Sequence, residues 1–296
     1  MRQIIQCAAN FSEGRNLTVI NEIVDAARDA SSVKVIDYSS DADHNRMVMT
    51  LLGNPAEICA SMIGAISAAA GRIDLRNHEG AHPRIGAVDV IPLVPIAGVK
   101  MSECVDLSYR IGDQIAANFS IPVYYYENSA IQEGHVKLPV IRKGGFEGLT
   151  GSMLLGERKP DAGPSYVHPS AGAVVIGARG PLVAYNINLA TDDMRIPREI
   201  VKRIRASCDL FPGLKVLSIN LQSRGLTQIS TNITQPDILP IDRIFSFVRD
   251  EAVRLGAEIV ESEFIGAVSR KYLGDNFISD LMAHDFKSTQ IIENWI

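Results

Sequence analysis

The sequence predicts an α+β protein built of two ferredoxin-like (βαββαβ) lobes with a cleft between them. Two observations predict it: runs of strand and helix period follow each other in the order β-α-β-β-α-β, and the same order returns in the second half of the chain. With 296 residues, 46% of them hydrophobic, the chain is long enough for two domains of ordinary size. We place the lobes at residues 1–178 and 179–296, and expect small ligands in the cleft.

In the first lobe, short apolar runs mark the strands, and apolar residues at helical spacing mark the helices. Apolar side chains between Val19 and Ala27 follow the helical period, and Pro55 suits the first turn of a second helix. Pro92 and Pro95 lack a backbone donor, so we expect their strand near a sheet edge or a bulge. The expected elements are a strand at 3–9, a helix at 17–30, strands at 33–38 and 46–53, a helix from Pro55 and a strand at 87–96.

The middle of the chain interrupts this pattern. A helix at 101–117 and a strand at 121–126 extend the first lobe, but residues 127–170 show no sustained period. Compact domains rarely contain so long a loop unless it contacts a ligand, so we expect a functional connection there. Beyond it we expect strands at 172–178 and 181–190, a helix at 193–208, strands at 214–221 and 225–232, a helix at 236–255 and a strand at 257–266.

Composition excludes several classes of function. Twenty-nine basic against 34 acidic residues leave a net charge of −5, which provides no positive field for nucleic acid. No stretch of 18 apolar residues occurs and the N-terminus has no secretion signal, so we expect a soluble, cytoplasmic protein without a membrane contact. The four cysteines form no C-x-x-C pair, which indicates reduced thiols rather than disulfides or a thiolate metal cluster.

The segment at 74–90, DLRNHEGAHPRIGAVDV, carries the densest chemistry in the chain. His78, Glu79 and His82 fit the H-E-x-x-H pattern of zinc peptidases, which needs both imidazoles on one face of a helix. Gly80 and Pro83 disfavour that helix, so we do not expect a metal here. A rigid loop can instead place one neutral imidazole in a cleft for proton transfer near neutral pH, although a surface histidine without a role fits the spacing too.

Two further loops carry polar groups that suit an anionic ligand. The loop at 10–16 lies between a strand and a helix, so its amides and Ser12 could meet an anion, although a simple helix cap is the other interpretation. Arg46 begins a strand after a polar turn and could offer two parallel hydrogen bonds to a carboxylate.

The segment at 161–172, DAGPSYVHPSAG, is rich in glycine and proline and poor in charge. It contains neither a dinucleotide-binding glycine pattern nor a phosphate loop, so nucleotide phosphates are not the expected ligand. Its backbone could lie along a flat heterocycle, and an ordinary linker between domains explains it equally well. The chain has no G-x-S-x-G elbow for acyl transfer.

Together these segments resemble the glutamate formimidoyltransferases, including the N-terminal transferase region of formimidoyltransferase-cyclodeaminase. The resemblance covers essentially the whole chain, and the histidine loop and N-F-S-E-G are its most specific parts. The matching motifs are C-A-A-N-F-S-E-G-R at 7–15, D-A-D-H-N-R at 41–46, H-E-G-A-H-P-R-I-G-A-V-D-V at 78–90, I-P-V-Y-Y-Y at 121–126, G-P-S-Y-V-H-P-S-A-G at 163–172, G-A-R at 177–179 and N-I-N-L at 186–189. The sequence departs from the family at Ala8-Ala9, where Val-Pro is more usual, and in the residues at 165–168.

The resemblance implies an enzyme that moves the formimidoyl group of N-formimidoyl-L-glutamate to N5 of tetrahydrofolate in histidine degradation. Tetrahydrofolate is then a co-substrate, no metal is expected, and the protein is a homodimer. His82 matches the acid–base histidine of the family. The matching folate-binding residues are Gly163, Pro164, Ser165, Tyr166, Val167, His168, Pro169, Ser170, Ala171 and Gly172. The candidates for contact with substrate are Asn10, Ser12, Glu13, Asn45, Arg46 and Arg84, with Arg179 a weaker one.

Three other functions stay open at this point. N-formylglutamate could be the donor, because the formyl and formimidoyl groups differ only by oxygen against imino nitrogen. A zinc hydrolase would use His78 and His82, and a non-catalytic protein would bind folate without transfer. The sequence contains no second helical domain, so we expect a separate cyclodeaminase protein to carry out any later elimination of ammonia.

Overall fold

The computed structural model describes residues 2–296, which form two compact units at Met1–Gly180 and Pro181–Ile296. Each unit combines one β-sheet with helices, so the predicted α+β class is confirmed. The first unit contains a six-stranded mixed sheet and the second a four-stranded antiparallel sheet. The helices among residues 2–296 are all too short or too polar to span a bilayer.

The first unit begins with a β-α-β-β-α-β run whose four strands pair antiparallel with one another. Its sheet has the order β2-β3-β1-β4-β6-β5, in which the last two strands run parallel to β4. The elements are β1 (Ile4–Phe11), α1 (Leu17–Asp29), β2 (Lys34–Asp41), β3 (Arg46–Gly53), α2 (Pro55–Arg72), β4 (Val88–Ala97), α3 (Met101–Phe119), β5 (Val123–Tyr125), α4 (Leu138–Ile141), α5 (Gly145–Leu154) and β6 (Val174–Ala178).

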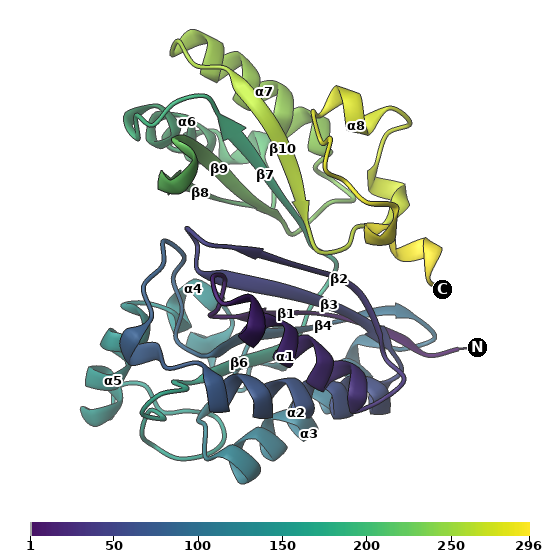
Figure 1. The fold of residues 1–296 in the computed structure, drawn as a ribbon, viewed down its shortest axis with the longest axis vertical. Helices are drawn as coiled ribbons and strands as arrows, with labels where there is room; N and C mark the ends of the chain where they lie inside the picture. The colour runs from purple at the N-terminus through teal and green to yellow at the C-terminus, as the bar shows by residue number, and fades with distance from the viewer. Residues whose placement is uncertain (1) are drawn as a thin grey trace. The chain divides into compact units, whose positions relative to one another are not determined.

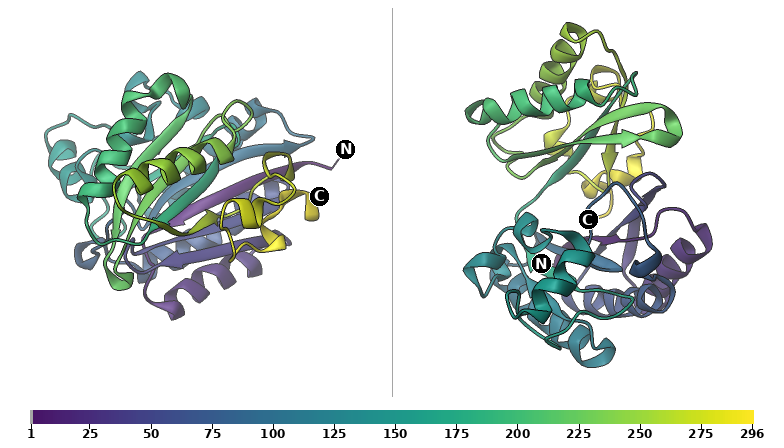
Figure 2. Two further views of the ribbon diagram at one scale, coloured as in Figure 1. Left: turned by 90° about the horizontal axis from the view of Figure 1, so that it is seen from above. Right: turned by 90° about the vertical axis from the view of Figure 1, so that its left-hand side faces the viewer.

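Helices α1, α2 and α3 cover one face of this sheet (Figure 1; Figure 2, right). Asn16 caps α1 by accepting hydrogen bonds from the amides of Thr18 and Val19, and Asn54 and Glu57 form a capping box at α2. The apolar stripes of the helices then bury against alternate residues of β1, including Cys7 and Phe11. This packing fixes the helix-covered face and leaves the strand ends to carry the polar loops.

Strand β4 was expected near a sheet edge or a bulge, and the bulge is the alternative that holds. The strand lies between β1 and β6 and not at an edge, because β6 comes from far along the chain and pairs with it. The predicted bulge is present: the register with β1 shifts where Pro95 and Ala97 face Ile5 and Ile4. An irregular pairing at that point accommodates a residue without a backbone donor.

The segment at 127–170 also differs from the expectation of a long loop. It contains helices α4 and α5 and two turns of 3₁₀-helix. Ile141, Leu149 and Met153 from this segment pack with Tyr124 and Val175 in a small second core. The two helices have only four and ten residues, which explains why no sustained period shows in the sequence.

The second unit repeats the element order of the first. Its strands have the order β10-β7-β9-β8, which matches β4-β1-β3-β2 strand for strand. Helices α6 and α7 pack on one face, where Ile200, Ile204 and Val248 contact the sheet core around Tyr185 and Ile187. The elements are β7 (Val183–Leu189), α6 (Arg195–Ala206), β8 (Leu214–Leu221), β9 (Leu226–Ile233), α7 (Ile241–Arg254), β10 (Ile259–Ile265) and α8 (Phe277–Asp280).

Candidate active site

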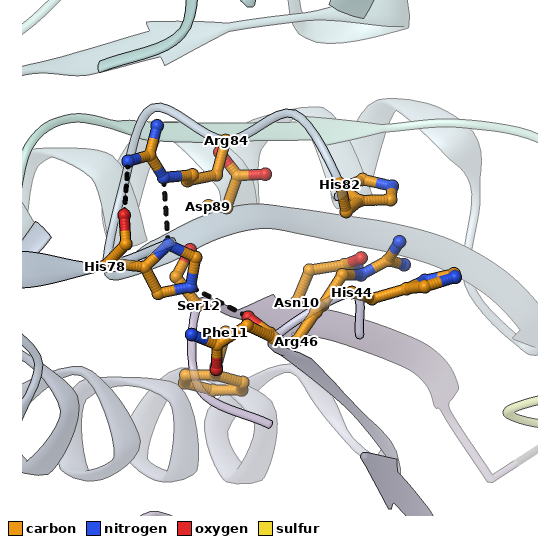
Figure 3. Close-up of a pocket in the computed structure, with 10 residues that line it drawn as sticks. Asn10, Phe11, Ser12, His44, Arg46, His78, His82, Arg84 and Asp89 are labelled. Carbon is orange, nitrogen blue, oxygen red and sulfur yellow. Dashed lines mark hydrogen bonds between the residues drawn. The ribbon is translucent and has the colours of Figure 1, made fainter. Parts of the chain in front are cut away.

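A small pocket lies in the first unit, where the end of β1 meets the starts of β3 and β4 (Figure 3). It encloses about 190 Å³, part of it open to solvent. The three motif-bearing loops of the sequence, at 10–16, 41–46 and 78–86, converge there. The lining residues are Asn10, Phe11, Ser12, His44, Asn45, Arg46, His78, His82, Arg84 and Asp89.

Asn45 ties the three loops together. Its side-chain Oδ1 accepts a hydrogen bond from the Gly14 amide at 2.9 Å, and its Nδ2 donates to the Glu79 carbonyl at 2.9 Å. Its own carbonyl oxygen accepts from Nε2 of His78 at 2.8 Å. The backbone is left-handed, with φ of 47°, a conformation that asparagine tolerates better than most residues. We predicted Asn45 to contact the substrate, but its hydrogen bonds mainly hold the three loops of the site together.

Two glycines allow the loops to approach this closely. A Cβ added at Gly14 would lie 2.2 Å from the Asp41 carbonyl oxygen, and one at Gly80 would lie 2.3 Å from the His44 carbonyl oxygen. Both distances are far below van der Waals contact. The contact between the loops thus requires the glycines of N-F-S-E-G and H-E-G-A-H.

His82 lies in this pocket on a loop without regular structure. Its Nδ1 lies 2.9 Å from the carbonyl oxygen of Pro83, and since a carbonyl only accepts, Nδ1 carries the proton. The lone pair is then on Nε2. The ring stacks with that of His44 at 6.0 Å between centroids, at the same end of the pocket as Arg46 (Figure 3).

The surroundings of His82 favour the neutral imidazole. Burial lowers its pKa well below the ordinary histidine value, and the nearby charges of Arg46, Arg142 and His44 lower it further. A histidine that is neutral at physiological pH, with its tautomer fixed by a backbone acceptor, can accept a proton at Nε2.

His78 has a different role, because both of its ring nitrogens are engaged. Nε2 donates to the Asn45 carbonyl, and Nδ1 accepts from Nε of Arg84 at 3.0 Å. Burial lowers its pKa, in agreement with a neutral ring. Residues 78–83 are not helical, and residues 2–296 hold no group of three His, Cys, Asp or Glu side chains arranged for a metal ion. The geometry therefore lacks what an H-E-x-x-H zinc site needs.

Arg84, predicted to pair with a substrate carboxylate, already pairs with Glu147 on α5. Its Nη1 and Nη2 donate to the two carboxylate oxygens at 3.0 and 2.9 Å, and Nη2 also donates to the His78 carbonyl at 3.0 Å. The Arg84 side chain is 14% exposed and that of Glu147 is 66% exposed. Arg84 therefore holds the histidine loop against α5.

Sequence reasoning missed a second charged cluster beside His82. The buried Asp89 carboxylate accepts from the Ile85 amide at 2.8 Å and forms an ion pair with Arg142. Arg46 lies close to both residues. Its pKa is lowered to about 10, mainly by burial and then by the nearby positive charge of Arg142. Asp89 belongs to the histidine segment, but nothing in the unpatterned stretch at 127–170 singles out Arg142.

The remaining candidates of the first loop divide into two groups. Asn10 and Ser12 line the pocket, although the Ser12 hydroxyl donates to the Gly86 carbonyl at 2.7 Å. Glu13 lies outside the lining: its carboxylate accepts from the amides of Arg15 and Asn16 at 2.8 and 2.9 Å. With the next amides of α1 bonded to Asn16, this helix start is capped by the chain itself.

The segment at 163–172 runs beside the end of the histidine loop without lining the pocket. Gly172 bridges to Gly86, and Ala171 accepts a hydrogen bond from the Ala87 amide at 2.8 Å. Tyr166 at its tip is 57% exposed. The segment thus presents an exposed aromatic ring. Its backbone pairs with residues just before β4, at the end of the loop that carries His82.

Two family models match the chain with this arrangement of loops. Residues 4–179 match the formiminotransferase domain, N-terminal subdomain, and residues 184–292 match the formiminotransferase domain. The chain belongs to the formiminotransferase family. The family predicted from its motifs is confirmed, and the protein is a transferase.

Curated relatives of this formiminotransferase extend over its whole length. A glutamate formimidoyltransferase from Streptococcus pyogenes serotype M1 is 39% identical over 295 residues, which cover 99% of both chains. One from Thermoplasma acidophilum is 39% identical over 292 residues, 98% of this chain and 96% of that one. The formimidoyltransferase-cyclodeaminase of Sus scrofa is 36% identical over 280 residues, which cover 93% of this chain and 52% of that longer protein.

Proposed function

We propose that this formiminotransferase moves the formimidoyl group from N-formimidoyl-L-glutamate to N5 of tetrahydrofolate, a step of histidine degradation in the cytoplasm. The names of the full-length relatives support the two substrates. The observation that carries the proposal is the state of His82, a neutral imidazole with a free Nε2 in a pocket of about 190 Å³.

In this proposal His82 moves one proton in two directions. N5 attacks the amidine carbon of the donor, and His82 Nε2 accepts the proton that the attacking nitrogen loses. The same imidazolium then returns the proton to the glutamate nitrogen as its bond to carbon breaks. General acid–base assistance of this kind is typically worth about 10²- to 10⁴-fold in rate. Proximity of the two substrates supplies a further part of the acceleration, and no metal takes part in the proposal.

The charge of the pocket lining favours the donor as its occupant. Arg46 lines the pocket, and a guanidinium group suits a carboxylate of the glutamate donor. In this proposal the pocket holds the donor and the reacting atom of the folate. We propose that the remainder of the folate contacts residues 163–172, whose exposed Tyr166 offers a ring for stacking.

We propose that each unit is a ferredoxin-like lobe. The repeated order of elements and strands supports this assignment. We also propose that the protein is a homodimer and that a separate protein performs any cyclodeaminase step.

The test is a transfer assay with purified protein, tetrahydrofolate and each donor in turn. Formation of the N5-substituted folate with N-formimidoyl-L-glutamate and not with N-formyl-L-glutamate is the expected result. Product from the formyl donor alone would replace the proposal with a formyltransferase. Binding of tetrahydrofolate without transfer from either donor would refute the proposed activity and identify a folate-binding protein.

A further inference from the structure

Two arginines lie together beside His82. Arg46 and Arg142 lie near each other, and the buried Asp89 carboxylate is the acidic group shared between them. Asp41, the other acid near Arg46, accepts a hydrogen bond from the His44 amide at 2.7 Å. An anionic ligand would find guanidinium donors here that the two carboxylates do not fill.

The hydrogen-bonding state of the two arginines agrees with this. Nε of Arg46 and Nε of Arg142 are both buried and lack a hydrogen-bond partner among residues 2–296. Buried donors normally have partners, and each lost bond to a charged group is costly. Arg84 differs, because Glu147 already fills both of its terminal nitrogens.

Asp89 fixes Arg142 relative to the pocket. One Asp89 oxygen accepts from the Ile85 amide, at the end of the histidine loop, and the other pairs with Arg142. The Arg142 side chain is 12% exposed, and that of Asp89 is 3% exposed. Asp89 itself lines the pocket, so its ion pair places Arg142 directly beside a residue of the pocket lining. The turn before α5 thus supplies a cation that is held in place next to the pocket.

We propose that Arg142, held by Asp89, binds a carboxylate of the glutamate donor together with Arg46, beside His82. This inference rests on the proposed function and adds the residue that selects the donor. A glutamate donor carries two carboxylates, and a guanidinium matches a carboxylate with two parallel hydrogen bonds. The carboxylates of the folate's glutamyl tail share that chemistry, so the test must separate the two sources.

The main experiment compares steady-state kinetics of the wild type and Arg142→Gln. The expected result is a rise of about 10- to 100-fold in KM for N-formimidoyl-L-glutamate, the cost of a charge-assisted hydrogen bond, with KM for tetrahydrofolate unchanged. Lys143→Gln is the matched control, because Lys143 is the exposed neighbouring cation, and it should leave both KM values unchanged. A rise confined to the KM for tetrahydrofolate would assign Arg142 to the folate tail and overturn the proposal.

Donor analogues make the test specific to the contact. Two analogues replace either the α- or the γ-carboxylate of N-formimidoyl-L-glutamate with an amide. In the wild type, one of them should lower kcat/KM by about 10- to 100-fold, and in Arg142→Gln that penalty should disappear because the partner is gone. If both analogues suffer the same penalty in the variant as in the wild type, Arg142 does not contact the carboxylate.

Two further measurements keep the outcome clear. Arg142→Lys preserves the ion pair with Asp89 and should fold even if Arg142→Gln does not; it should give an intermediate KM, and a wild-type KM would overturn the proposal. Calorimetric titration with the donor measures binding without turnover. Tight donor binding that Arg142→Gln weakens, in a protein that transfers nothing, would refute the proposed function and support the carboxylate site.

Discussion

Arg84 donates from Nε to Nδ1 of His78 at 3.0 Å, and its Nη2 donates to the carbonyl oxygen of the same histidine at 3.0 Å. One guanidinium therefore fixes both the ring and the backbone of a residue four positions before His82. Because Nδ1 of His78 accepts, its Nε2 must carry the proton that bonds to the Asn45 carbonyl. The contact sets the tautomer of His78 and joins the histidine loop to α5 through Glu147.

Arg84→Met should lower kcat by about 10- to 100-fold, since small displacements of a catalytic group carry costs of this size. Steady-state kinetics with both substrates measure the effect. The acid limb of the pH profile should stay in place, because Arg84 is not among the groups that lower the pKa of His82. Arg76→Gln is the control: Arg76 lies in the same segment, is exposed, and its guanidinium pairs with Asp74. An Arg84→Met enzyme as active as the wild type would exclude a positioning role.

His82→Ala should lower kcat by about 10²- to 10⁴-fold with little change in the affinity for either substrate. The expected loss follows from removing the free Nε2, while the loop remains fastened at His78 and Asn45. Single-turnover transfer of the formimidoyl group measures the chemical step directly. His284→Ala, at an exposed histidine of the second unit, should behave as the wild type. A His82→Ala enzyme with unchanged turnover would remove His82 from the mechanism.

The acid limb of kcat/KM should lie below the ordinary histidine pKa of about 6.5. A general base works only when unprotonated, and burial with Arg46 and Arg142 lowers the pKa of His82, so the base form persists to lower pH. Arg46→Gln and Arg142→Gln should each move the limb to higher pH, since each removes a cation that opposes protonation. Measuring kcat/KM from pH 5 to 9 reports the free enzyme. A limb that neither substitution moves would mean that another group titrates.

Local patterns in the sequence predicted those parts of the fold that depend on near neighbours. Helix α1 was found because its apolar residues recur at helical spacing, and this signal lies within the element. The interior place of β4 was missed, because β6 pairs with it from more than 70 residues further along. Helices α4 and α5 are too short for a periodic signal.

The same distinction applies to the site. The loops with His82 and Arg46 were found because their residue types are concentrated in short motifs, and they do line one pocket. Arg142 acquires its place only through an ion pair with a residue 53 positions away, which no local pattern contains. Glu13 and Asn45 illustrate the converse: both lie in specific motifs, yet their side chains are bonded to the backbone that shapes the site.

Gly80→Ala should destabilise the protein and slow transfer, because the new methyl group would lie 2.3 Å from the His44 carbonyl oxygen and 2.9 Å from Cβ of Asn45. The neighbouring bond from the Ala81 amide to the Asp43 carbonyl, at 3.0 Å, must then lengthen, and the histidine loop moves away from Arg46. We expect a loss of about 1–3 kcal/mol in the free energy of unfolding, the usual cost of overpacking, measured by urea unfolding. Gly71→Ala, in α2 with no atom within 4 Å of the added Cβ, is the matched control and should stabilise by about 0.5–1 kcal/mol. If Gly80→Ala stays within about 0.5 kcal/mol of the wild type, the loops are free to separate, and the contact through Asn45 does not fix His82.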